Sequence, residues 1–201
     1  MLFPKPTGWI FFTLSWQMLQ GAVYEFTPDD DQIFTACPDK PGTNGILDIV
    51  DISEIILEYN DGVVRVEGNM TFIWEDVKPT DRIEVIGEIL KFKRGSWQPT
   101  ILTMRLGDFC RVQYDALSPW YPVWTVNVPE NERKCINNFG HTIHYRPYNV
   151  YTAAEYFINL EGRHKIVVNV YAYDENNMKR PRSYCFELIG VFAKVKKQRS
   201  M

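Results

Sequence analysis

Hydrophobic and polar residues alternate with a period of two along several segments of this chain, which is the pattern of half-buried β-strands. The clearest example is "EIILEYNDGVVRVEGNMTFIW", in which Asn60-Asp61-Gly62 separates two β-branched runs and predicts a hairpin turn. The second run contains the N-glycosylation sequon Asn69-Met70-Thr71, and a glycan on Asn69 has to point to water. The opposite face is therefore expected to point inward. It carries Val64, Val66, Met70, Phe72 and Trp74.

Further strands are expected within residues 24–34, 83–92, 100–106, parts of 143–158, 165–173 and 184–195. In "RIEVIGEILKF" the apolar positions change parity between Val85 and Leu90, which predicts a β-bulge at Gly87. The last segment, "YCFELIGVFAKV", is apolar on both faces, as in a central strand covered on both sides. Short helices are expected only in "RVQYDAL" and "YTAAEYF". The pattern predicts a mainly β fold with two sheets arranged as a cup or sandwich.

The first 22 residues have the features of a secretory signal peptide. Lys5 precedes the apolar run "WIFFTLSWQML", which ends at the small residues Gly21 and Ala22. The run is shorter than the about 20 apolar residues that cross a bilayer. We expect cleavage near Ala22, which leaves one secreted, extracellular domain over residues 23–201 without stable membrane insertion.

The charge of the chain argues against nucleic acid as a partner. The formal net charge is −3, and it becomes −4 when Lys5 is removed with the signal peptide. Binding to nucleic acid requires a concentrated basic face, which this balance does not provide.

Four cysteines follow the signal peptide: Cys37, Cys110, Cys135 and Cys185. In an oxidising compartment, an even number of widely spaced cysteines predicts two disulfides, with three possible pairings. None of the spacings is C-x-x-C, which argues against a metal knuckle or a redox motif.

The sequence offers no convincing catalytic or metal-binding constellation. His141 and His144 are three positions apart, which places them on opposite faces of a strand. No G-x-S-x-G, H-E-x-x-H or Gly-rich phosphate loop occurs. We therefore expect a protein that is not an enzyme and uses no metal or cofactor. An extracellular hydrolase would instead require His141 or His164 beside a buried carboxylate and a serine.

Large aromatic residues gather in "SPWYPVW", residues 118–124, between Cys110 and Cys135. Pro119 and Pro122 disfavour a helix or a central strand, so this segment is expected to be a surface loop. An exposed aromatic cluster is typical of a binding site, and we expect at least one of the two tryptophans to face a cavity. The aromatic residues are Trp120, Tyr121 and Trp124.

The chain resembles the insect CheA chemosensory family, a group of small secreted proteins. The resemblance is carried, in order, by "YEF…DDDQIF…C", "VEGNMTFIW", "PTDRIEV", "RGSWQPTILTM", "DFC", "YPVWTVNV", "HYRPYNV" and "GRHKIVVNVYAYDENNMKRPRSYCFELIGVFAKV". These segments cover nearly all of the mature chain, and "RGSWQPT" and "RPRSYCFEL" are the most specific among them.

The resemblance implies a function in the perception of chemical stimuli, with a hydrophobic cue such as a pheromone as ligand. The family is similar to ganglioside activator proteins, whose ML-type lipid-recognition fold is a cup of two β-sheets around an apolar cavity. The resemblance also implies the disulfides Cys37–Cys185 and Cys110–Cys135. Ganglioside activators carry more cysteines than the four found here, so their specificity does not transfer.

Two functions remain open at this point. The first is a non-enzymatic secreted carrier or co-receptor that binds a lipid-like or pheromone-like small molecule between two sheets, with a chemosensory receptor or ion channel as a candidate partner. Its expected wall is Val64, Val66, Met70, Phe72 and Trp74, with Trp120, Tyr121 and Trp124 at the mouth. The alternative is an interaction module with a solid core that presents the aromatic patch to a receptor or channel.

Overall fold

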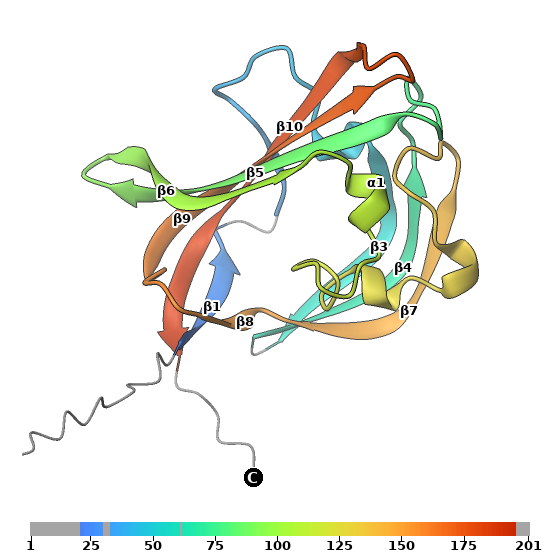
Figure 1. The fold of residues 1–201 in the computed structure, drawn as a ribbon. Helices are drawn as coiled ribbons and strands as arrows, with labels where there is room; N and C mark the ends of the chain where they lie inside the picture. The colour runs from blue at the N-terminus through green and yellow to red at the C-terminus, as the bar shows by residue number, and fades with distance from the viewer. Residues whose placement is uncertain (1–20, 30–32, 61, 196–201) are drawn as a thin grey trace, which may run out of the picture.

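The computed structural model of the chain describes residues 21–29, 33–60 and 62–195. Most of the expected signal peptide, residues 1–20, lies outside the described residues. The fold is mainly β, with two sheets that curl into a cup (Figure 1). The large sheet has seven strands in the order β6-β5-β9-β10-β1-β8, with β2 paired to β10, and the small sheet has the order β3-β4-β7. The prediction of a mainly β fold with two sheets is confirmed.

The strands are β1 (Ala22–Pro28), β2 (Thr35–Ala36), β3 (Val50–Asn60), β4 (Val63–Phe72), β5 (Arg82–Lys93), β6 (Ser96–Leu106), β7 (Thr142–Tyr151), β8 (Ala153–Tyr156), β9 (Gly162–Tyr173) and β10 (Lys179–Val195). The short helices are η1 (Ile46–Asp48), α1 (Phe109–Val112), η2 (Thr125–Asn127) and η3 (Glu130–Glu132). Within the described ranges, every helix falls short of the length and apolar character that a bilayer crossing requires.

The predicted hairpin joins β3 to β4. Asn60 pairs with Val63, and Gly62 has a φ of +76°, a conformation that glycine adopts without steric cost. Further along β4, Gly68 has a φ of +112° and approaches the carbonyl oxygen of Glu54 so closely that a Cβ atom would clash with it. Both neighbouring strands change register near Gly68, so this glycine lets the small sheet bend around the core.

The two sheets are connected through a nearly continuous strand formed by β7 and β8. At the junction, the backbone N–H of Thr152 donates to the carbonyl oxygen of Gly62 in the small sheet, at 3.1 Å. The N–H of Phe26 in the large sheet donates to the carbonyl oxygen of Thr152, also at 3.1 Å. Because one residue pairs with both sheets, the wall of the cup is continuous on this side.

Around Cys185, β10 is covered on both faces, as predicted for the last segment. On the inner face, Tyr184 and Phe186 of β10 join the main hydrophobic core. On the outer face, Cys185 is completely buried with Cys37 and Val167. The ammonium group of Lys165 also lies buried on this face, 3.0 Å from a carboxylate oxygen of Glu187.

Both disulfides have the pairing that the family resemblance implied, Cys37–Cys185 and Cys110–Cys135. The first fastens the N-terminal segment to the outer face of β10. The second closes a loop that begins at α1 and ends before β7, so it holds the aromatic segment against the cup.

Three local predictions are wrong. "YTAAEYF" is not a helix, because residues 153–156 form β8 and pair with β1. "RVQYDAL" is helical only at its start, where α1 ends at Val112. Gly87 is not a bulge, because β5 pairs with β9 without interruption. Leu90 packs instead on the outer face beside the buried Cys37–Cys185 disulfide, which explains the change of apolar parity.

The irregularity in this part of the sheet belongs to β6. Glu88 pairs with Thr103, but Leu90 pairs with Pro99, so β6 contains extra residues between these two pairs. The hydroxyl of Thr100 donates to the carbonyl oxygen of Ile89 at 2.6 Å, and it accepts the N–H of Leu102 at 3.1 Å. This side chain therefore supplies hydrogen bonds where the regular ladder is interrupted.

Candidate functional site

The main core fills one end of the inner face of the cup, and a smaller cluster of Tyr24, Leu160 and Phe192 packs at the other end, with a hollow between them. In β9, alternate residues from His164 to Ala172 point inward, because Val170 and Ala172 belong to the main core. Val170 and Ala172 are buried, but Ile166 and Val168 on the same face remain partly exposed. Inward-facing aliphatic side chains on a central strand are normally covered, so their exposure marks a space that the protein's own side chains do not fill.

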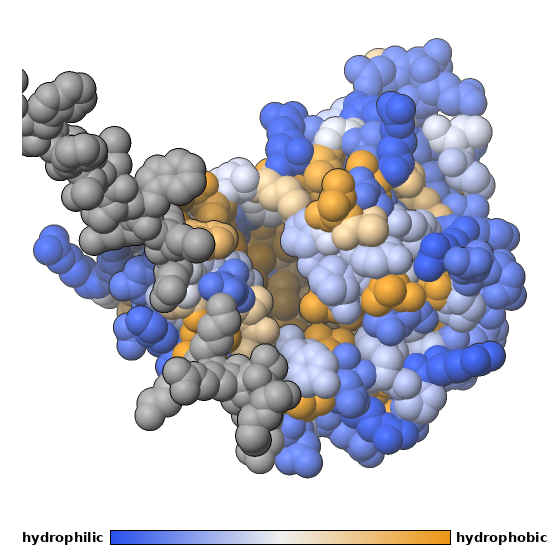
Figure 2. Space-filling model, turned by 60° about the horizontal axis from the view of Figure 1, so that its bottom comes forward, coloured by the Kyte–Doolittle hydropathy of each residue, from blue (hydrophilic) through white to orange (hydrophobic). Residues whose placement is uncertain are grey.

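Partly exposed hydrophobic residues of both sheets face inward, and we call the space that they face the hollow. Cross-strand register places them on the inner face: Val64, Ile89, Met104, Val150, Ile166, Val168 and Leu188. Figure 2 shows a depression lined by hydrophobic residues and surrounded by a mostly hydrophilic surface. Such a concave apolar site can remove a hydrocarbon chain from water.

The structure divides the predicted wall residues into two groups. Val64 borders the hollow, and Val66 follows it on the same face with 9% of its surface exposed. Met70, Phe72 and Trp74 lie in the main core, where Phe72 is 0% and Trp74 is 1% exposed. Trp74 packs edge-on against Tyr184, with 4.7 Å between ring centroids. Phe72 and Trp74 thus belong to the solid end of the cup, behind the hollow.

The aromatic segment lies against this solid end. The indole N–H of Trp120 donates to the carbonyl oxygen of Gln113 at 2.8 Å, and that of Trp124 donates to the hydroxyl of Tyr145 at 2.8 Å. Both rings pack around Phe109 of α1, with centroid distances of 5.3 Å and 6.4 Å. Burial raises the pKa of Tyr145 far above its ordinary value, so its hydroxyl stays neutral.

The tryptophans remain partly exposed, as does Tyr121, so the segment is a packed shoulder of the cup that still offers some aromatic surface. The exposed large hydrophobic residues of the surrounding loop are aliphatic: Leu117 is 92%, Val126 41% and Val123 39% exposed.

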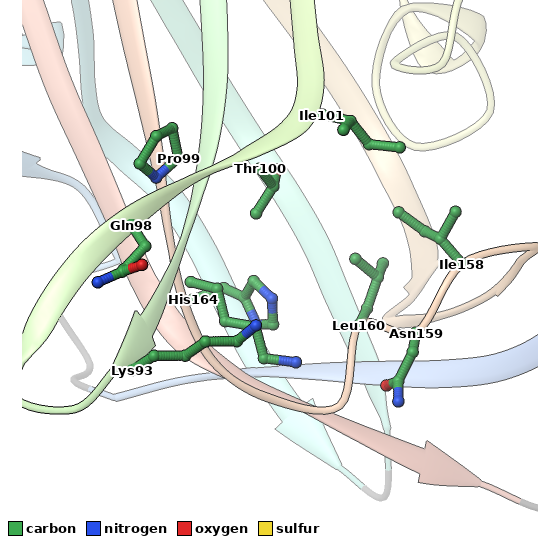
Figure 3. A pocket seen from close by; sticks show the side chains of 10 residues that line it. Lys93, Gln98, Pro99, Thr100, Ile101, Ile158, Asn159, Leu160 and His164 are labelled. Carbon is green, nitrogen blue, oxygen red and sulfur yellow. The ribbon is translucent and has the colours of Figure 1, made fainter.

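A pocket of about 380 Å³ lies at the open end of the cup, between β6 and the connection from β8 to β9. Its residues come from four segments: Lys91, Lys93, Gln98, Pro99, Thr100, Ile101, Ile158, Asn159, Leu160 and His164. Figure 3 shows Lys93, Gln98 and His164 at one side of the pocket, and Ile101, Ile158 and Leu160 at the other. The pocket thus has a polar, basic side and an aliphatic side.

His164 has an unusual environment for an imidazole. His164 is 0% exposed, and its Nδ1 lies 2.9 Å from the carbonyl oxygen of Gly162. A carbonyl can only accept, so Nδ1 carries a hydrogen and donates. Nε2 is buried and has no hydrogen-bond partner among the described residues. Burial, with the nearby charges of Lys91 and Lys93, lowers the pKa of His164, so Nε2 offers a lone pair at neutral pH.

The other two histidines make structural contacts in the small sheet. Glu132 accepts the backbone N–H of His144 at 2.7 Å, and its second carboxylate oxygen lies 3.0 Å from Nδ1 of the same residue. These contacts lower the pKa of Glu132. A ring nitrogen of His141 contacts the carbonyl oxygen of Glu132 at 2.6 Å. Among the described residues, the structure contains no group of three or more His, Cys, Asp or Glu side chains that could hold a metal ion.

The predicted glycan acceptor lies on the outer face of the small sheet. The Asn69 side-chain amide donates to a carboxylate oxygen of Glu54 at 2.7 Å, away from the inward-facing Met70. This orientation leaves the amide accessible from solvent.

Reasoning from the sequence missed the residues of the large sheet that border the hollow. "KIVVNVYAY" is apolar at most positions, so its pattern does not distinguish the inner Ile166 and Val168 from the buried outer Val167. The pocket was also missed, because Lys91 and His164 meet only through the pairing of β5 with β9.

No protein-family model matches the chain, and no curated protein matches it.

Proposed function

We propose that this protein is a secreted, non-enzymatic binding protein that carries a hydrophobic small molecule in the hollow between its two sheets. The observation that carries the proposal is the partial exposure of Ile166 and Val168 on the inner face of a central strand. The rest of the same face is packed, so the space is local and bordered by aliphatic side chains from both sheets.

The solid end of the cup gives the hollow a rigid base. Phe72, Trp74 and Tyr184 pack with at most 1% of their surface exposed, and the Cys110–Cys135 disulfide holds the aromatic loop beside them. A preformed apolar site loses little conformational entropy on binding, which favours affinity. About ten methylene groups at ~0.8 kcal/mol each give about 8 kcal/mol before association costs. Before association costs are subtracted, this magnitude corresponds to a dissociation constant of about 1 μM, so a ligand with more buried methylene groups is needed to keep the affinity micromolar.

Several features support an extracellular location. Two disulfides link all four cysteines, and disulfides persist in oxidising compartments. The expected signal peptide and the outward-facing Asn69 agree with the secretory route. The resemblance to the CheA family suggests a role in chemosensory perception, with a pheromone-like ligand passed to a receptor or ion channel.

The contacts of the tryptophans favour the carrier over the interaction module. Both indole N–H groups are already satisfied within the chain, and both rings pack around Phe109. An interaction surface built on these residues would have to use the ring edges that remain exposed.

Equilibrium binding of a neutral long-chain ligand tests the proposal. Purified, oxidised protein is dialysed against radiolabelled methyl palmitate, and we expect saturable binding with a micromolar dissociation constant. Ile166→Trp places a large ring in the hollow and is expected to weaken binding at least tenfold. Ile56→Trp is the matched control, because Ile56 lies on the outer face of β3 and is 51% exposed.

Two results would contradict the carrier. One is a wild-type protein that binds no neutral long-chain ligand above background. The other is a loss of binding that is equal for Ile166→Trp and Ile56→Trp, since a ligand in the hollow can be displaced only by the first.

A further inference from the structure

The pocket at the open end of the cup continues the inner wall of the hollow. Lys91 pairs with His164, and Ile89 pairs with Ile166, so the basic residues stand directly next to the aliphatic ones on the same face. From His164 to Val168 the inner face of β9 extends about 13 Å at ~3.3 Å per residue. A linear molecule can therefore place one end in the pocket and the rest along the hollow.

The polar side of the pocket carries two cations that are not neutralised. Neither Lys91 nor Lys93 has an ion-pair partner within the described part of the chain, and the described residues that line the pocket include no Asp or Glu. The neighbouring Arg163 is engaged elsewhere, since its guanidinium lies 2.6 Å from a carboxylate oxygen of Asp29. The pocket thus favours an anionic or strongly accepting group.

Nε2 of His164 needs a different kind of ligand group from the one that the two lysines need. It is buried without a partner in the described structure, and an unsatisfied buried polar atom is costly. The bond from Nδ1 to Gly162 and the edge-on contact with Phe192, at 5.3 Å between ring centroids, fix the ring. A ligand group that shares a proton with Nε2 and also accepts from ammonium groups would satisfy the whole pocket.

A carboxyl group has both properties. A carboxylic acid brings one proton. The hydrogen bond between a ligand oxygen and Nε2 forms whether this proton stays on the oxygen or moves to Nε2. The second oxygen accepts from lysine ammonium groups, and charge-assisted hydrogen bonds of this kind are the strong ones. An alcohol offers one oxygen for all these contacts, and an ester has no proton to share.

Resting on the proposed function, we infer that the ligand is a long-chain carboxylic acid. Its carboxyl group binds in the pocket to Nε2 of His164 and to the ammonium groups of Lys91 and Lys93, and its hydrocarbon chain lies in the hollow.

The test compares three ligands of equal chain length, palmitic acid, methyl palmitate and hexadecanol, on the oxidised protein. The wild type is expected to bind the acid at least tenfold more tightly than the ester or the alcohol. His164→Phe keeps an aromatic ring beside Phe192 and removes both nitrogens. It is expected to reduce the preference for the acid to less than threefold while leaving the affinity for the ester unchanged.

A second variant makes the test independent of the folding of His164→Phe. The double substitution Lys91→Met and Lys93→Met retains the aliphatic stems and removes both charges, and it is expected to weaken the acid about tenfold and not the ester. Lys134→Met, in the distant loop after η3, is the matched control and should leave all three affinities unchanged. The ¹⁵N resonance of Nε2 in His164 is expected to move when the acid is added and to stay in place with the ester.

The possible results separate this inference from the proposed function. Equal binding of acid, ester and alcohol would overturn the carboxyl site but leave the carrier intact. A tenfold acid preference that survives both the histidine and the lysine substitutions would also overturn it. Failure of all three ligands to bind would reject the carrier itself.

Discussion

The hollow makes a quantitative prediction about stability that needs no ligand. Ile83 in β5 and Ile166 in β9 are the same residue type on the inner face of the same sheet. Ile83 is 0% exposed in the main core, whereas Ile166 borders the hollow and is partly exposed. Replacing each with Ala removes the same atoms from a packed site and from an open one.

The expected losses follow from the two environments. At Ile83, removal of about three buried carbon groups costs about 2.4 kcal/mol at ~0.8 kcal/mol each. A new cavity of about 80 Å³ adds about 2 kcal/mol at ~24 cal/mol per Å³. Ile83→Ala should therefore lower the free energy of unfolding by about 4 kcal/mol. At Ile166 the same carbon groups are only partly buried, so removing them costs about half as much, and no closed cavity forms. Ile166→Ala should therefore lower the free energy of unfolding by about 1 kcal/mol.

Urea denaturation of the oxidised protein, followed by tryptophan fluorescence, measures both values. The dependence of the free energy on urea concentration should be the same in both variants, so that the midpoints report stability. The predicted difference of about 3 kcal/mol is large compared with the error of the extrapolation. If the two substitutions cost the same within about 1 kcal/mol, Ile166 is packed like Ile83 and the reasoning that places a hollow beside it is wrong.

Three further predictions follow from other parts of the structure. Burial opposes ionisation of Asp81, but hydrogen bonds from Arg180 and from the backbone N–H of Lys78 outweigh it and lower the pKa of Asp81. The contribution of Asp81 to stability is therefore complete at neutral pH, and it is lost as the pH falls below the ordinary value of 3.8. Asp81→Asn should cost about 3 kcal/mol at pH 7 and much less at pH 2, as measured by urea denaturation at both values; an equal cost at both would contradict the ion pair's role. Replacing both Cys110 and Cys135 with Ala should lower stability by about 3 to 4 kcal/mol in the loop-entropy model and expose the aromatic loop to trypsin, whereas unchanged cleavage would show that packing alone holds it. Mass spectrometry of protein secreted from insect cells should show a glycan that Asn69→Gln removes, with binding of methyl palmitate unaffected because Asn69 lies on the outer face.

The elements that the sequence predicted correctly are those with a clear turn sequence or a clear pattern of apolar residues. The hairpin at Gly62 follows from a turn sequence between two β-branched runs, and β10 follows from a long run that is apolar on both faces. The helix expected in "YTAAEYF" failed because pairing of this segment with β1 outweighed its weak helical preference. The bulge expected at Gly87 failed because Leu90 packs on the outer face of β5 beside the buried disulfide, which changes the apolar parity without any break in the pairing with β9.

The sequence by itself determined the β class, the inward face of β4 and the even set of cysteines, because these depend on side-chain period and residue type. The tertiary structure alone decided which inward residues are covered, because that depends on how far the two sheets curve toward each other. It separates Phe72 and Trp74 in the solid core from Val64 beside the hollow, although all three have the same strand parity. It also brings Lys91 beside His164 through the register of β5 and β9, a pairing between distant segments that no local pattern encodes.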